Sequence, residues 1–497
     1  MKTFTSNILD TDTQKRQGKP DRLPVILGLI AIVISGVLAA AISDYGVLIL
    51  LAVLALVFLV VVFVKPDYGL VIFIFITVTQ VSNVAIKFYG APSIARPLAA
   101  LLMAVILLRI VLYGERLLNM SRFFPVLALY IFALFVSMLS AEDFVLSSDT
   151  FNGFFKDALG GVIIILLIQR PASFRQAVWA MIIAGIFMGS ISVFQAVTDT
   201  YDNSYFGFGG WDTQTAGQQT RNRLTGPYAN PNAYSQVMVV IFALSLERLW
   251  HEKRSLLRLA AGWGAFATSL TIVLTYSRGG LLTFIATLGI LFLQNRPRLF
   301  PLLLTIVVGL GLTQLLPSDY ALRISTLQDL IPSQNNQITD QSFRGRLSEN
   351  IAAWRMFTDD PFFGVGLGNF SVQYQEYSRQ IGLDPRRVSR TPASLYLEVL
   401  SEQGLVGAIP FALLLYTIFT GLIYSRVHFT FAGLTDHSRI TMGLIAGFAG
   451  YMFAATVKNS AYSNVYWILV GLAISAYQVA LHYSREKSEL LGTRKAS

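Results

Sequence analysis

Apolar runs separated by short polar segments follow one another along most of this 497-residue chain. A helix that crosses a bilayer needs roughly 20 consecutive, mainly apolar residues. The pattern therefore predicts an all-α, polytopic helical membrane protein with about 12–14 transmembrane helices. The runs lie near residues 23–43, 46–64, 68–87, 94–113, 122–140, 153–169, 173–197, 231–248, 256–276, 279–294, 298–315, 404–425, 438–457 and 461–482.

One polar interval is much longer than the others, and it sets the expected organisation of the chain. We expect two short tails, a main transmembrane bundle, a large external loop with amphipathic helices, and a C-terminal group of transmembrane helices. In chain order the parts are the tail 1–22, the bundle 23–315, the loop 316–403, the helices 404–482 and the tail 483–497.

Lys and Arg indicate which side of the membrane each short loop occupies, because cytoplasmic loops are enriched in both. The clearest clusters are HEKRSLLR (251–258) and SREKSELLGTRK (484–495). The polar N-terminus is too long and too mixed in charge for a secretory signal, so the first run is predicted to be a retained anchor. Both termini are then expected in the cytoplasm, and the 316–403 loop outside.

The composition agrees with a membrane protein and narrows the chemistry. Hydrophobic residues make up 54% of the chain and charged residues 13%, whereas a soluble domain carries about 25% charged residues. The chain has no cysteine, which excludes disulfides, thiolate metal sites and a cysteine nucleophile. Nothing in the sequence suggests a nucleic-acid partner.

The predicted external segments are rich in arginine and poor in lysine. Arginine presents a planar fork that binds phosphate through two hydrogen bonds, whereas lysine is a point charge. Any one of these arginines is better explained by a neighbouring carboxylate or an anionic lipid head group. For the group as a whole, phosphate binding is a competing interpretation. Within residues 342–407 the arginines are Arg344, Arg346, Arg355, Arg379, Arg386, Arg387 and Arg390.

Two local patterns occur in this loop. Apolar residues at helical spacing over 343–357 predict an amphipathic helix lying along the bilayer surface. GVGLGNF (364–370) resembles a phosphate-binding glycine loop only superficially, because no strand precedes it and no Lys-Ser/Thr follows it. A tight chain reversal with close backbone approach is the better interpretation.

Two other external segments carry arginines next to turns. In residues 198–234, Arg223 precedes a turn at Gly226-Pro227, and Asn230 is expected to cap the following helix. The tight turn 275–280 places Arg278 at the outer membrane boundary, where an ionisable group is a functional suspect. A snorkelling side chain at a helix end is the alternative for Arg278.

The histidines constrain the possible chemistry. His251, His428, His437 and His482 all fall in or beside predicted cytoplasmic segments. The external side therefore lacks a histidine base and histidine metal ligands. Apart from Asp359-Asp360, which better explain a helix end, no external carboxylate cluster suits Mg²⁺. We expect neither a metal nor another cofactor.

Four motifs resemble the O-antigen ligase and polymerase family, and they occur in the family's order. They are RLTGPYANPNAY (223–234), TYSRGG (275–280), the block from Arg346 to GVGLGNF (346–370), and SLYLEVLSEQGLVG (394–407). They cover roughly the second half of the chain, and the first half matches only as generic apolar spans.

The resemblance implies an integral membrane glycosyltransferase of the GT-C type in a bacterial inner (plasma) membrane. Such a protein moves a glycan from a polyprenyl-diphosphate carrier to a glycan or lipid acceptor on the external face, without nucleotide or metal. Arg223, Arg278 and Arg346 match the arginines that bind the diphosphate in this family, and Arg344 is a further candidate. Membrane lipids and polysaccharide-assembly proteins are additional candidate partners.

One departure from the family concerns the proton acceptor. The family's ligases carry His-Asn where this chain has Ala393-Ser394. Glu398 is the leading substitute base and Glu402 the second, because a partly buried carboxylate can act as a general base. The alternative to a catalytic role is that each glutamate balances the positive charge of the nearby arginines. Separately, Trp354 and Tyr396 are candidates to stack on sugars, although aromatic residues also line membrane interfaces.

Two other function classes remain open at this stage. An anion transporter of the bicarbonate type would also use external arginines, but the spans lack evident ionisable residues at depth. A non-catalytic component of a polysaccharide export assembly would explain the missing histidine. Neither ligase nor polymerase activity is favoured over the other.

Overall fold

A computed structural model of the chain describes residues 56–57, 59–114, 117, 123–216, 219–295, 341–383, 390–458 and 463–496. The apolar runs predicted at 23–43 and 298–315 lie outside these residues, as do Arg386 and Arg387. The chain divides into two units, Met1–Gly69 and Leu70–Ser497. All contacts given below lie within the second unit.

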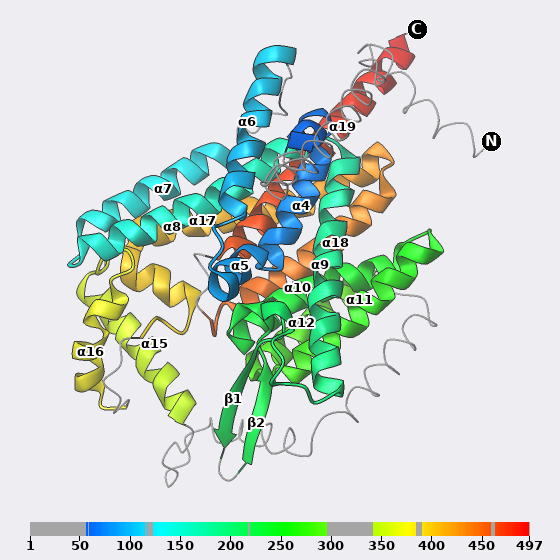
Figure 1. The fold of residues 1–497 in the computed structure, drawn as a ribbon. Helices are drawn as coiled ribbons and strands as arrows, with labels where there is room; N and C mark the ends of the chain where they lie inside the picture. The colour runs from blue at the N-terminus through cyan, green and yellow to red at the C-terminus, as the bar shows by residue number, and fades with distance from the viewer. Residues whose placement is uncertain are drawn as a thin grey trace, which may run out of the picture. The chain divides into compact units, whose positions relative to one another are not determined.

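The described residues form helices with one short β-hairpin (Figure 1). Their bounds are α4 Pro66–Val78, α5 Val81–Tyr89, α6 Ala95–Tyr113, α7 Phe123–Leu139, α8 Phe144–Leu167, α9 Pro171–Val197, η1 Tyr205–Gly207, β1 Trp211–Ala216, β2 Gln219–Leu224, η2 Gly226–Tyr228, α10 Pro231–His251, α11 Ser255–Leu274, α12 Arg278–Asn295, α15 Gln341–Asp359, α16 Phe370–Ile381, α17 Leu395–Ala432, α18 Thr435–Ala454 and α19 Asn464–Ala496.

The described ranges contain six helices that are long and apolar enough to cross a membrane. They are α6, α8, α9, α11, α17 and residues Asn464–Leu491 of α19; α4 and α5 meet at a 55° bend and together make a seventh candidate. Large apolar side chains such as Val111 and Phe132 point out of the protein, as expected where lipid is the solvent. The protein is an all-α polytopic membrane protein, as the sequence predicted.

Two predicted runs differ in detail from the helices observed. The run at 68–87 is broken, because Gln80 adopts a left-handed conformation (φ 58°) between α4 and α5. The short run at 153–169 is the apolar end of the longer helix α8. That helix begins earlier because the side chain of Asp143 accepts a hydrogen bond from Leu146 N at its N-terminus.

Helix α10 is buried on all sides over most of its length. It packs against α9, α11, α12 and α18. Glycines let its neighbours come close: a Cβ added at Gly185 of α9 would lie 2.2 Å from Ile241, and one at Gly447 of α18 would lie 3.2 Å from Val240. Small residues at helix contacts are the usual means of close packing inside a membrane.

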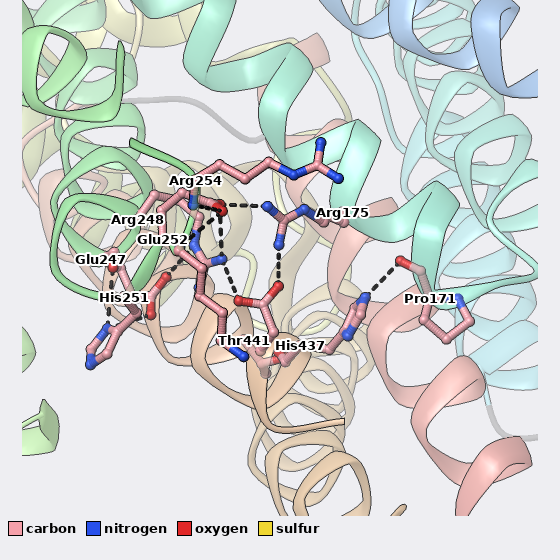
Figure 2. A network of polar contacts seen from close by, with 11 residues as sticks. Pro171, Arg175, Glu247, Arg248, His251, Glu252, Arg254, His437 and Thr441 are labelled. Carbon is pink, nitrogen blue, oxygen red and sulfur yellow. Dashed lines mark hydrogen bonds and ion pairs between the residues drawn. The ribbon is translucent and has the colours of Figure 1, made fainter. Parts of the chain in front are cut away.

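A buried ion network joins the C-terminal end of α10 to α9 and α18 (Figure 2). Arg248 of α10 is fully buried and contacts Glu247 at 2.7 Å and Asp436 of α18 at 2.8 Å. Arg175 of α9 binds both Glu252 and Asp436. The network ties the N-termini of α9 and α18 to the C-terminus of α10.

The candidate site lies near the opposite ends of the same helices. It adjoins the N-terminus of α10 and the C-terminus of α18, described below. Helix α10 has 21 residues, and at a rise of 1.5 Å per residue it is roughly 30 Å long. The network and the site, at its two ends, are therefore roughly 30 Å apart. That distance is about the thickness of a bilayer's hydrocarbon core.

Candidate functional site

The turn between α11 and α12 positions Arg278 as the first residue of α12. Tyr276 adopts a left-handed conformation (φ 49°), which lets the chain reverse within three residues. Ser277 caps the new helix, because its Oγ accepts a hydrogen bond from Gly280 N at 3.0 Å. The same Oγ donates to Asn232 Oδ1 at 2.8 Å. The predicted tight turn at Arg278 is therefore present, and it is tied to the start of α10.

Arg223 reaches this turn from the β-hairpin. β1 and β2 pair antiparallel, with Asp212 opposite Arg223. The Nε of Arg223 donates to the carbonyl oxygen of Thr275 at 3.0 Å. Arg223 thus contacts the turn that carries Arg278, although the sequence separates the two predicted diphosphate ligands widely.

The segment between β2 and α10 is fixed as the sequence predicted. Gly226 adopts φ 51°, and a Cβ there would lie 2.6 Å from the ring of Tyr234. Asn230 caps α10 through hydrogen bonds from Asn232 N and Ala233 N. The hairpin itself was not predicted from the sequence.

The segment 455–458, which follows α18, joins the start of α12 to the start of α17. Leu395 N donates to Ala455 O at 2.9 Å, and Tyr396 Oη donates to Met452 O at 3.0 Å. On the other side, a Cβ added at Gly279 would lie 2.9 Å from Val457. Arg278 and the first turn of α17 therefore flank the same short segment.

Lys458, the next residue, brings Arg346 and Glu398 into the same region. Burial lowers the pKa of the Lys458 ammonium, the carboxylates of Glu398 and Glu349 oppose this shift, and the Arg346 guanidinium adds to it. These four side chains therefore lie within electrostatic reach of one another. Arg390 in turn binds Glu349, with Nη1 2.6 Å from Oε1.

Lys458 was not among the residues predicted for the site. The sequence offered one signal, a lysine at the end of an apolar run on the predicted external side, where lysine is rare. Its closeness to Arg346 depends on contacts between distant parts of the chain, which the sequence alone does not show.

The two candidate bases have different surroundings. Glu398 is 4% exposed in the first turn of α17 and belongs to the charged group around Lys458. Glu402 Oε2 accepts a hydrogen bond from Gly368 N at 2.9 Å. Glu402 therefore holds the glycine-rich loop.

The GVGLGNF segment is the chain reversal that the sequence predicted. Val365 N and Gly366 N donate to the backbone oxygens of Ser401 and Glu402 at 2.9 and 3.0 Å. A Cβ at Gly364 would lie 2.5 Å from the backbone of Glu402. Gly404 (φ 57°, ψ −158°) breaks α17 at this contact, so the helix that begins at Leu395 and the predicted span 404–425 meet at a kink.

The remaining predicted residues occupy other positions. Trp354 is 53% exposed, and its ring lies 5.5 Å from that of Phe357. It points away from the buried face of α15, where Ala352, Ala353 and Met356 pack instead. The half-buried Tyr396 presents its hydroxyl to Met452 O.

Arg344 also lies on α15, in its first turns. Among the described residues its buried Nε has no hydrogen-bond partner. No cluster of three His, Cys, Asp or Glu side chains suited to a metal ion occurs in the described part of the chain.

Part of this site lies in a region that resembles known proteins. A family model described as O-antigen ligase matches residues 263–412. This part of the chain is similar to O-antigen ligases. The matched domain contains Arg278, Arg346 and Glu398, whereas Arg223 and Lys458 lie outside it.

A relative of the protein was also found. Over 162 residues the chain is 32% identical to the teichuronic acid biosynthesis protein TuaE of Bacillus subtilis (strain 168). The matched region covers 30% of this chain and 31% of that relative. The O-antigen ligase resemblance seen in the four sequence motifs is confirmed.

Proposed function

We propose that this protein is a membrane glycan transferase of the O-antigen ligase or polymerase type. It moves an oligosaccharide from a polyprenyl-diphosphate carrier to a glycan or lipid acceptor, on the external face of a bacterial plasma membrane. Both termini lie in the cytoplasm in this proposal. The relative's name, with its reference to teichuronic acid biosynthesis, supports a role in polysaccharide synthesis.

One observation supports the proposal: the turn that carries Arg278 touches Val457, and Arg346 acts electrostatically on the next residue, Lys458. Arg223 of β2 is hydrogen-bonded to the same α11–α12 turn. Guanidinium groups held in fixed positions can bind the phosphates of a lipid-linked donor. They also stabilise charge that develops as the diphosphate leaves, without having to reorganise during the reaction.

The transfer step needs a nucleophile and a proton acceptor. A hydroxyl oxygen of the acceptor sugar or lipid bonds to the anomeric carbon, and the bond from that carbon to the diphosphate oxygen breaks. The electron pair of that bond leaves with the lipid diphosphate, where the arginines stabilise it. The hydroxyl proton passes to a carboxylate, for which Glu398 is placed better than Glu402 because Glu398 lies beside Arg346 and Lys458.

The proposal is tested by removing the arginines one at a time from the full-length protein. We expect Arg278→Ala and Arg346→Ala each to abolish polymer or ligated glycan in a strain that depends on this gene, while both proteins remain inserted in the membrane. Arg379→Ala is the matched control, because Arg379 lies in the same loop, is 66% exposed and is 3.9 Å from Glu376. Unchanged glycan in both test variants would contradict the proposal.

Experiments with purified protein separate a transferase from a transporter. Purified protein that releases lipid diphosphate from a lipid-linked oligosaccharide is a transferase. Purified protein that instead carries an anion into proteoliposomes, in a manner dependent on Arg278, is a transporter.

A further inference from the structure

Lys458 lies where the elements of the proposed site meet. Consecutive turn hydrogen bonds, from Thr456 N to Phe453 O and from Val457 N to Ala454 O, fix the backbone just before it. Val457 packs on Gly279 so closely that a Cβ there would have to displace it. The backbone carrying Lys458 is therefore anchored directly beside the first turn of α12, where Arg278 lies.

We propose that Lys458 is a further cation of the donor site, and that its ammonium binds the diphosphate and stabilises it as it leaves. This inference rests on the proposed transferase function and adds a residue that neither the sequence motifs nor the matched domain contains. Lys458 lies beyond residue 412, the last residue of the matched domain.

The charges around Lys458 favour an anionic ligand. Glu398 faces it from α17, while Arg346 and Glu349 face it from α15. One of the two carboxylates, Glu349, is already bound by Arg390. On the α12 side the neighbouring charge is Arg278, with Arg223 behind it at Thr275. Three cations, Lys458, Arg346 and Arg390, thus face two carboxylates in this group, and its net positive charge attracts a diphosphate.

A partly buried ammonium that feels the charge of a guanidinium holds its proton less firmly than an exposed lysine does. Burial, with Arg346, lowers the pKa of Lys458 from the usual 10.5. An anion bound beside it favours the charged form and raises the pKa again. The donor and the Lys458 proton therefore bind cooperatively, and donor binding weakens as the pH rises through the lowered pKa.

Two substitutions test this role in the full-length protein, reconstituted in lipid nanodiscs with a polyprenyl-diphosphate oligosaccharide as donor. Lys458→Met removes the charge and keeps much of the apolar stem, and Lys458→Arg keeps the charge up to a much higher pH. The measured quantities are kcat/KM for the donor, from the rate of lipid diphosphate release, and its dependence on pH. That ratio reports ionisations of the free enzyme.

We expect Lys458→Met to lower kcat/KM for the donor roughly tenfold to a hundredfold, the effect of losing one hydrogen bond to a charged group. Lys458→Arg should retain most of the activity at neutral pH, and its alkaline decline should move to higher pH than in the natural protein. If Lys458 had only a structural role, the Lys458→Arg substitution would not shift the alkaline decline in activity. Wild-type kcat/KM in Lys458→Met, or an unmoved alkaline limb in Lys458→Arg, would overturn the inference.

Failure of this inference is distinguishable from failure of the proposed function. If Arg278→Ala is inactive while Lys458→Met behaves like the natural protein, the transferase function stands and the role of Lys458 is wrong. If the natural protein releases no lipid diphosphate, both are wrong. Should Lys458→Met fail to insert, the pH profile of Lys458→Arg decides alone.

Discussion

The Nε of Arg223 donates a hydrogen bond of 3.0 Å to the carbonyl oxygen of Thr275. This contact joins the β-hairpin to the turn that carries Arg278, so the hairpin and the α11–α12 turn form one structural unit. A guanidinium can make such a backbone contact through Nε and still direct its two terminal nitrogens elsewhere. A lysine makes all of its hydrogen bonds from one nitrogen, so it cannot bind Thr275 O and also direct a planar pair of N–H donors at a phosphate.

Arg223→Lys should therefore be a damaging substitution although it conserves the charge. We expect the loss of one charged hydrogen bond to lower kcat/KM for the donor roughly tenfold to a hundredfold, with Arg223→Ala at least as low. Rates of lipid diphosphate release from purified protein measure this. Arg379→Lys in the exposed part of the loop is the control and should behave like the natural protein. Full activity in Arg223→Lys would show that the donor does not need the paired terminal nitrogens of Arg223.

The glycine-rich loop gives a prediction on stability. A Cβ at Gly364 would meet the backbone of Glu402, Ser401 and Gln403 at 2.5–2.7 Å, and its φ is +69°. Gly382 has a similar φ of +72° but nothing within 4 Å of its Cβ position. Gly382→Ala therefore isolates the backbone strain, which costs about 1–2 kcal/mol, whereas Gly364→Ala adds a backbone collision.

We expect Gly364→Ala to lower the midpoint of thermal unfolding in detergent clearly more than Gly382→Ala does. It should also reduce transfer, because the displaced backbone of residues 401–403 belongs to the helix that carries Glu398. Equal unfolding midpoints in the two variants would show that the close contact between the loop and α17 is absent.

Local features of this site could be predicted from the sequence because the residues that make them are neighbours. The Asn230 cap, the Gly226-Pro227 turn and the tight turn at Arg278 each depend on a few adjacent residues whose backbone preferences are known. The chain reversal at GVGLGNF could be predicted for the same reason. The motifs indicated the family whose model matches residues 263–412, because they combine several such turns in a fixed order.

The assembly of the site could not be predicted in the same way. Lys458 reaches Arg346 and Glu398 only because α15, α17 and the segment after α18 pack together. Helical spacing over 343–357 would place Trp354 on the apolar face of the predicted helix, but smaller side chains such as Ala352 fill the buried face of α15. The β1–β2 hairpin was missed because WDTQTA and QTRNRL are almost entirely polar and lack the alternation that marks a strand.

The buried ion network at the other end of α10 gives a second prediction on stability. Arg248 is fully buried and contacts Glu247 and Asp436, so Arg248→Met would leave both carboxylates without that partner. Breaking a buried ion pair from one side costs about 3–5 kcal/mol. We expect a large fall in the unfolding midpoint, whereas Arg254→Met, at an exposed position in the same segment, should change it little.

The effect of Arg248→Met on catalysis should be indirect. Because the network lies one membrane thickness from Arg278, protein that remains folded should keep its KM for the donor. A selective rise in KM, with the unfolding midpoint unchanged, would show that the network takes part in donor binding.

The two glutamates on α17 are distinguished by what their carboxylates contact. Glu402 accepts a hydrogen bond from Gly368 N, and a glutamine oxygen can accept the same bond. Glu402→Gln should therefore leave both the loop and the activity nearly unchanged, while Glu402→Ala should lower the unfolding midpoint. Glutamine at position 398 keeps the size of the side chain but cannot take up the acceptor's proton.

We expect Glu398→Gln to lower kcat about 100-fold to 10,000-fold, the usual contribution of a general base, with little change in donor affinity. Single-turnover transfer measures the first quantity, and binding of a non-reactive lipid diphosphate measures the second. The reverse result, with Glu402→Gln inactive and Glu398→Gln active, would assign the proton to Glu402 and make Glu398 a partner of the cations. Activity in both variants would require a base outside α17, because these are the two carboxylates of the helix segment that replaces the family's histidine.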